Sequence, residues 1–115
     1  MAISMKELNL EQGMPTVDTA LRWLEAELAA ARKMGRPALK LIHGYGSSGR
    51  GGKIRTACRK YLREQAESGR IRLVIRGEDF SIFSEETRRG FVLCGQLRQD
   101  RDLDRENRGV TFILL

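Results

Sequence analysis

The chain has 115 residues, a length that predicts one domain. Hydrophobic residues make up 41% of it and aromatic residues only 6%, so we expect a single, mainly aliphatic core. Its 21 Lys and Arg residues outnumber its 15 Asp and Glu residues and give a formal net charge of +6.

Membrane, secreted and structural-zinc proteins are excluded by these features. No apolar segment approaches the ~20 residues of a membrane-spanning helix, and residues 1–9 lack the apolar core of a secretion signal. Two cysteines, Cys58 and Cys94, are too few for a disulfide framework or a four-ligand zinc site. We therefore expect a reduced, cytoplasmic protein that holds neither a metal nor another cofactor.

The positive charge is concentrated in one quarter of the chain. Residues 35–63, the basic stretch, contain eight basic residues and no Asp or Glu, whereas the other 13 basic residues are outnumbered by the 15 acidic ones. Charges of a single sign over a stretch of this length favour a polyanion-binding surface over a solvated helix face with incidental charge. The eight residues are Arg36, Lys40, Arg50, Lys53, Arg55, Arg59, Lys60 and Arg63.

The first elements in chain order are a strand, a helix and a second strand. Apolar residues alternate imperfectly over 5–10, which indicates a short strand. Over 17–31 they recur at spacings of three and four, which predicts an amphipathic helix capped by Thr16 and ended by Gly35. Residues 38–42 are apolar nearly throughout and predict a strand in the middle of a sheet.

The following elements are a second helix, two strands and an excursion between them. The second helix should begin near Lys53 and end at Gly69, with Arg55, Arg59 and Arg63 on a face that is not the apolar one. Residues 71–75 and 110–115 predict the last two strands.

Residues 77–109 form the excursion. We expect a short helix after Ser84, which is a typical N-cap, and then a mixed-charge loop over 98–108. The whole order predicts an α/β fold: a two-layer sandwich with a mixed, mostly parallel sheet and right-handed crossovers. We expect a single domain over 1–115, with its core in 5–76 and 110–115.

A glycine-rich loop joins the strand at 38–42 to the second helix. Five of the ten residues from His43 to Gly52 are glycine. The pattern GxGxxG from Gly44 matches the dinucleotide-binding motif, but it follows the second strand and lacks the acidic ribose ligand at a later strand end. The end of the loop resembles a P-loop, but the first glycine and the magnesium-binding Ser or Thr are missing.

We predict instead a phosphate-binding loop that does not read bases. Glycines let backbone amides approach an anion closely, and a helix N-terminus adds partial positive charge. His43, the single histidine, follows the strand at the start of this loop. The predicted binding residues are Gly44, Gly46, Gly49, Arg50, Gly51, Gly52, Lys53, Arg55 and Arg59.

The loop HGYGSSGRGGKIR at 43–55 resembles that of the Smr (small MutS-related) domain family. Gly13-Met14 and Thr16-Val17-Asp18-x-Ala20 resemble the start of the family's first helix, so the resemblance covers 8–63, and the final strand also fits. The domain occurs at the C-terminus of bacterial MutS-like recombination suppressors and as small free-standing proteins.

The resemblance implies a fold, a partner and, in many members, an activity. The implied fold is a two-layer α/β fold similar to the C-terminal domain of translation initiation factor 3. The implied partner is DNA or RNA, in DNA repair and recombination or in RNA and ribosome quality control. Many members nick DNA or cleave RNA without an obligatory metal site.

The first-strand motif departs from the family pattern LDLHG. This chain has Leu8-Asn9-Leu10-Glu11-Gln12-Gly13, so Asn9 replaces the acid and Glu11 replaces the histidine that are implicated in cleavage. The sequence therefore favours binding over cleavage. Two alternatives stay open: an endonuclease that uses His43 with Glu11 as acid and base, and a protein-interaction module that docks a partner through 98–108. The sequence does not decide between DNA and RNA.

Overall fold

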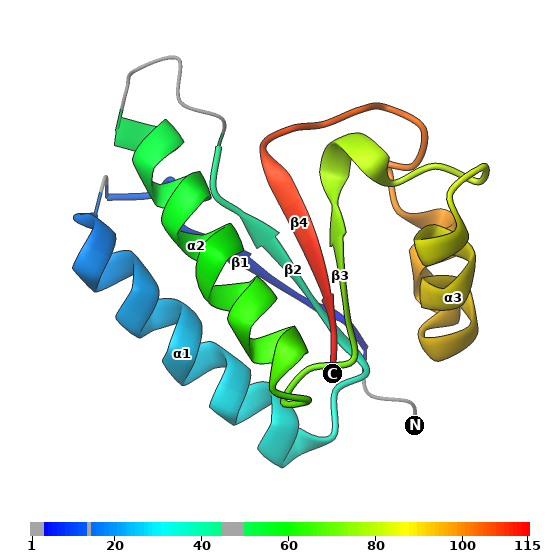
Figure 1. The fold of residues 1–115 in the computed structure, drawn as a ribbon, viewed down its shortest axis with the longest axis horizontal. Helices are drawn as coiled ribbons and strands as arrows, with labels where there is room; N and C mark the ends of the chain where they lie inside the picture. Colours follow the sequence, from blue (N-terminus) through cyan, green and yellow to red (C-terminus); the bar gives the residue numbers. More distant parts are fainter. Residues whose placement is uncertain (1–3, 14, 45–49) are drawn as a thin grey trace.

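A computed structural model describes residues 4–13, 15–44 and 50–115, with the backbone alone for 50 and 51. It shows a four-stranded sheet with helices on both faces (Figure 1). The elements are β1 (Lys6–Asn9), α1 (Val17–Met34), β2 (Ala38–Ile42), α2 (Arg50–Glu67), β3 (Leu73–Arg76), the 3-10 turn η1 (Gly77–Asp79), α3 (Glu85–Leu93), the 3-10 turn η2 (Gly95–Gln99) and β4 (Val110–Leu114).

Helix α1 has the boundaries that its local sequence predicts. The Thr16 hydroxyl accepts a hydrogen bond from the Thr19 N–H at 3.2 Å, as an N-cap does. Gly35 ends the helix in the left-handed region, at φ 73°, where a residue without a Cβ is least strained. Apolar side chains at helical spacing form its buried face: Ala20, Leu24, Leu28 and Ala31.

The sheet is mixed and has the order β1-β2-β4-β3. Strands β1 and β2 are parallel neighbours, joined by α1 in a β-α-β crossover, whereas β4 pairs antiparallel with both β2 and β3. The prediction of a mixed sheet with an internal 38–42 strand is therefore confirmed. Three strands run in one direction, but β2 and β3 are not neighbours because β4 lies between them.

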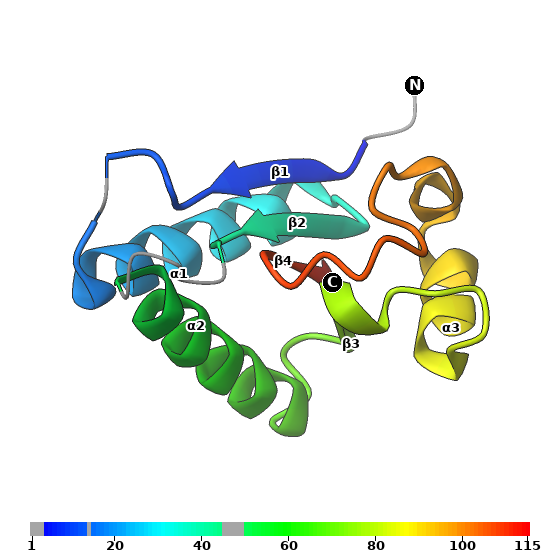
Figure 2. The ribbon, with the colours of Figure 1, turned by 90° about the horizontal axis from the view of Figure 1, so that it is seen from above.

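The sheet buries apolar side chains on both faces. On one face, Leu39, Leu41 and Ile113 pack against α1 and α2, as the two-layer prediction requires. On the other face, Phe112 and Leu114 pack against side chains of residues 77–109. Figure 2 shows α1 and α2 on one side of the strands and α3 on the other. The excursion thus adds a third layer, which the sequence analysis did not predict.

Two elements begin two or more residues away from their predicted position. Helix α2 begins at Arg50, three residues before the expected start, and Gly69 follows its end at φ 80°. Strand β3 begins at Leu73 instead of residue 71. Ile71 is buried, but its N–H donates to the carbonyl of Gln65 at 3.4 Å, so the residue continues the end of the helix before the strand starts.

Lys40 is the largest correction to the basic stretch. Its side chain is 0% exposed and lies on the α3 face of the sheet. The Nζ atom is 2.6 Å from the Asp102 carboxylate and 3.0 Å from that of Asp100. Lys40 is therefore not part of any exposed cationic surface. The mixed-charge loop predicted over 98–108 supplies its counterions and closes this face of the core.

Candidate nucleic-acid interface

The predicted site lies at one end of the sheet, where three of the strands terminate. We call this region the loop edge. The carboxyl ends of β1, β2 and β3 meet here with the start of β4 and the start of α2 (Figure 1). Lys53, Arg55 and Arg59 belong to α2, and His43 and Gly44 follow β2 at this edge. Gly46 and Gly49 lie outside the described residues, as does the side chain of Arg50.

Gly44 occupies a position that requires glycine. Its φ is +73°, and a Cβ there would lie 2.9 Å from the Oε1 atom of Glu11. The N–H groups of His43 and Gly44 both donate to the Gly109 carbonyl, each at 3.0 Å. The Gly44 amide is therefore engaged with the chain just before β4 and is not a donor for a phosphate in this conformation.

His43 is buried and has a defined tautomer. The residue is only 1% exposed to solvent. Nδ1 lies 2.6 Å from the Gly44 carbonyl, which can only accept, so Nδ1 carries the proton and the neutral ring accepts at Nε2 from the Thr111 hydroxyl at 2.8 Å. The pKa of His43 is lowered to about 4, mainly by burial and to a smaller extent by the nearby Arg59 and Arg55, whereas the hydrogen bond to Gly44 opposes this shift.

Arg59 forms a bidentate ion pair with Glu78. Its Nη1 and Nη2 atoms lie 2.8 Å and 2.7 Å from the two carboxylate oxygens, and Nε donates to the Thr111 hydroxyl at 3.2 Å. Burial opposes ionisation of Glu78, but the hydrogen bonds that the carboxyl accepts, together with the charges of Arg59 and Arg76, lower its pKa. A hydrogen-bonded chain thus runs from Glu78 through Arg59 and Thr111 to His43.

This network corrects the expected role of Arg59. The sequence placed it among phosphate ligands, whereas its guanidinium is occupied by Glu78 and by β4. Glu78 and Thr111 were missed by the sequence analysis. No local pattern marks them, because they follow Arg59 by 19 and 52 positions and come near it only through the order of the strands.

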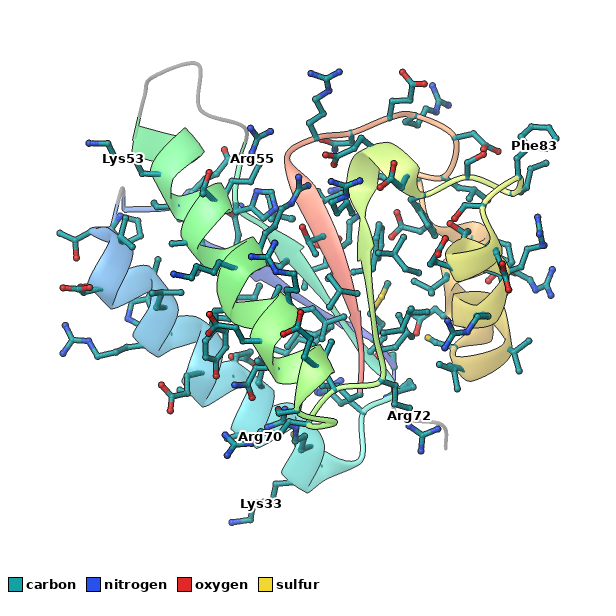
Figure 3. The ribbon with its side chains drawn as sticks, in the orientation of Figure 1. Lys33, Lys53, Arg55, Arg70, Arg72 and Phe83 are labelled. Carbon is teal, nitrogen blue, oxygen red and sulfur yellow. The ribbon has the colours of Figure 1, made fainter. Side chains whose placement is uncertain are left out.

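Lys53 and Arg55 are the described cations that remain available at the start of α2. Figure 3 shows them on opposite sides of the first turns of the helix. Lys53 is exposed and Arg55 half-buried, and neither forms an ion pair with another described residue. Arg55 is close enough to His43 to lower the pKa of its ring. Two full charges therefore flank the end of α2 that follows the glycine loop.

Asn9 ends β1 at the same edge, and Glu11 follows it. The Asn9 side-chain oxygen accepts the Glu11 N–H at 2.8 Å, which closes a turn after the strand. The exposed Glu11 carboxylate lies beside Gly44. The structure thus brings Glu11 near the 43–44 segment, but both ring nitrogens of His43 have other partners, and the described residues show no Glu11–His43 hydrogen bond.

Other chemistry has little support in the part of the chain that the structure describes. It contains no group of three or more His, Cys, Asp or Glu side chains arranged to hold a metal ion. Burial raises the pKa of the Cys58 thiol to about 11, so this cysteine is a poor nucleophile. Over the same residues, no helix combines the length and the apolar character needed to cross a bilayer.

Comparisons with known proteins agree with the fold and the loop. The fold is similar to that in the crystal structure of the Smr domain of Thermus thermophilus MutS2, with a TM-score of 0.56, 22% sequence identity and 98% of each chain covered. No curated protein sequence matches the chain. The family model of the Smr domain matches residues 9–79, which run from the end of β1 to η1 and include the whole loop edge except β4. The chain therefore belongs to the Smr domain family.

Proposed function

We propose that this Smr domain binds DNA or RNA through the phosphate backbone at the loop edge. The observation that carries the proposal is the pair Lys53 and Arg55, which flank the start of α2 without a described ion-pair partner. The start of a helix attracts anions, and the sequence between 35 and 63 holds no acidic residue to oppose them. Contacts of this kind position a nucleic acid without reading its bases.

Three residues of the basic stretch play other parts in this proposal. Lys40 is buried against Asp100 and Asp102, and Arg59 is neutralised by Glu78. Arg36 lies at the opposite end of the sheet, where its guanidinium donates to the Ser4 carbonyl. The proposed footprint is therefore smaller than the basic stretch and is centred on the first turns of α2.

Replacing both Lys53 and Arg55 by Ala should weaken binding to duplex DNA and to RNA with little dependence on base sequence. Each lost phosphate contact should reduce the slope of log K against log salt by about 0.7–0.9. The measurement is fluorescence anisotropy over a salt series. The matched control is Arg22→Ala/Arg89→Ala, which removes the same charge from exposed positions on α1 and α3. Equal slopes in the two double variants would remove Lys53 and Arg55 from the interface.

The environment of His43 favours binding over cleavage. A general acid must carry a proton at the working pH, and a histidine with a pKa of about 4 is almost wholly neutral near pH 7. Its burial and its two hydrogen bonds also keep it from reaching a phosphodiester. Glu11 adds a negative charge beside the start of the loop, which disfavours close approach of a phosphate.

Purified protein should therefore show no multiple-turnover cleavage of supercoiled plasmid or stem-loop RNA. General acid–base catalysis contributes about 10²–10⁴-fold, so its absence leaves at most slow residual nicking. The assay compares the wild type with His43→Ala and Glu11→Ala at concentrations that saturate binding. Turnover that disappears in either variant, with its fold intact by circular dichroism, would favour the endonuclease alternative instead.

A further inference from the structure

A second group of cations lies at the end of the sheet opposite the loop edge. Figure 3 shows Lys33, Arg70 and Arg72 at that end, far from Lys53 and Arg55. A pocket of about 370 Å³ opens at this end beside Arg72. Its lining residues are Arg32, Gly35, Arg36, Pro37, Arg72, Leu93 and Leu115. None of them has a carboxylate side chain, and the α-carboxylate of Leu115 is the one anionic group among these residues.

Three different segments supply the arginines of this pocket. Arg32 belongs to the last turn of α1, Arg36 to the turn before β2, and Arg72 directly precedes β3. Basic residues in the last turn of a helix commonly offset its dipole, which accounts for Arg32. The dipole does not account for Arg36 and Arg72, because they lie outside the helix.

Two of the guanidinium groups are held in place by backbone carbonyls. Arg32 Nη2 donates to the Arg70 carbonyl at 3.0 Å, and Arg36 Nη1 donates to the Ser4 carbonyl at 2.7 Å. Each bond uses one of five N–H donors, so both groups are oriented while most of their donors remain available. Arg72 makes no side-chain hydrogen bond to a described residue, and none of the three arginines forms an ion pair within the described residues.

We infer that this pocket binds a phosphate group. Arg32, Arg36 and Arg72 line one concave site, and guanidinium groups match the oxygens of a phosphate. Because two of the three are already held, binding there loses little side-chain entropy. The phosphate can be a free phosphate group or part of a nucleic-acid backbone. Only the nucleic-acid case rests on the proposed function. In that case the domain has anion sites at two opposite ends and contacts two nucleic-acid segments at once.

The first test uses inorganic phosphate and the backbone amide resonances of the whole chain. Titration at constant ionic strength should give saturable shifts at the amides of Gly35, Arg36 and Arg72. These shifts should disappear in Arg36→Gln/Arg72→Gln and persist in Lys53→Gln/Arg55→Gln, which removes the same charge at the other end. Arg72→Gln alone should weaken phosphate binding about tenfold, the loss of one charge-assisted hydrogen bond.

Two results would overturn the inference. One is that the amide shifts at the pocket rise linearly with phosphate concentration and do not saturate. The other is that Arg72→Gln gives saturable amide shifts of the same size as those of the wild type. The single variant guards against a change in fold, because the Arg72 side chain holds no other described segment in place.

The second test distinguishes the two sources of phosphate. Duplex DNA is titrated onto Lys53→Gln/Arg55→Gln and onto the triple variant that also carries Arg72→Gln. A further fall in affinity assigns the pocket to nucleic-acid phosphates, whereas unchanged affinity with intact phosphate shifts assigns it to a free phosphate group. Failure at the pocket leaves the loop edge untouched, so the inference and the proposed function fail separately.

Discussion

Lys40→Met should destabilise the protein by about 3–5 kcal/mol, the usual cost of removing one partner from a buried ion pair. The Asp100 and Asp102 side chains are only 8% and 12% exposed, and without Lys40 their negative charges would lie against an apolar sheet. Burial opposes ionisation of Asp102, but hydrogen bonds from Lys40 and Asn107, together with the charges of Lys40 and Arg101, lower the pKa of the carboxyl. Urea unfolding at pH 7 measures the loss directly.

Two further variants test whether the loss of stability in Lys40→Met comes from the burial of the ion pair. Lys6→Met removes an exposed lysine that pairs with Glu27 at 2.6 Å, and a surface pair of this kind should contribute less than about 1 kcal/mol. Adding Asp100→Asn and Asp102→Asn to Lys40→Met should restore part of the lost stability, because the uncompensated charges are gone. A Lys40→Met loss no larger than that of Lys6→Met would contradict the structural role of the buried pair.

Acidification from pH 7.5 to pH 4.5 should cost about 3 kcal/mol of stability through His43 alone. The folded pKa is about 4 and the ordinary value is 6.5, so between these values the unfolded chain binds a proton that the folded chain does not. The contribution is therefore complete above pH 6.5 and is lost as the pH falls towards 4. Each unit of difference corresponds to about 1.4 kcal/mol.

The comparison with His43→Gln isolates this effect from the carboxylates that also titrate. An amide gains no proton in this range, so the variant should be less stable at pH 7.5 but should lose about 3 kcal/mol less than the wild type on acidification. The measurement is urea unfolding at both pH values. If the wild type and the variant lose the same stability, His43 is not held neutral in the folded protein.

Features that depend on neighbouring residues were predictable from the sequence. The spacing of apolar residues over 17–31, with Thr16 before it and Gly35 after it, defines α1 because capping and burial act within a few residues. The N-cap at Ser84 was predictable for the same reason, and its hydroxyl accepts the Thr87 N–H. The glycine loop led to the correct family because its residues are consecutive in the chain.

Features that depend on distant partners were not predictable. Lys40 looked like one more cation of the basic stretch because Asp100 and Asp102 lie some sixty residues later, in a loop with no regular pattern. Arg59 was assigned to the phosphate surface for the same reason, since Glu78 belongs to another element. His43 was expected at the start of the loop, where the structure has it, but its hydrogen bond to Thr111 of the last strand was not predictable.

The position of β4 between β2 and β3 sets the order in which the domain can assemble. Leu41 pairs with Thr111, about seventy residues later, so two of the three strand ladders close only when the last segment docks. Closing such long intervals is entropically costly and slows folding relative to helical proteins of the same size. The hydrogen bonds of His43 and Arg59 to Thr111 therefore form only once β4 has docked between β2 and β3.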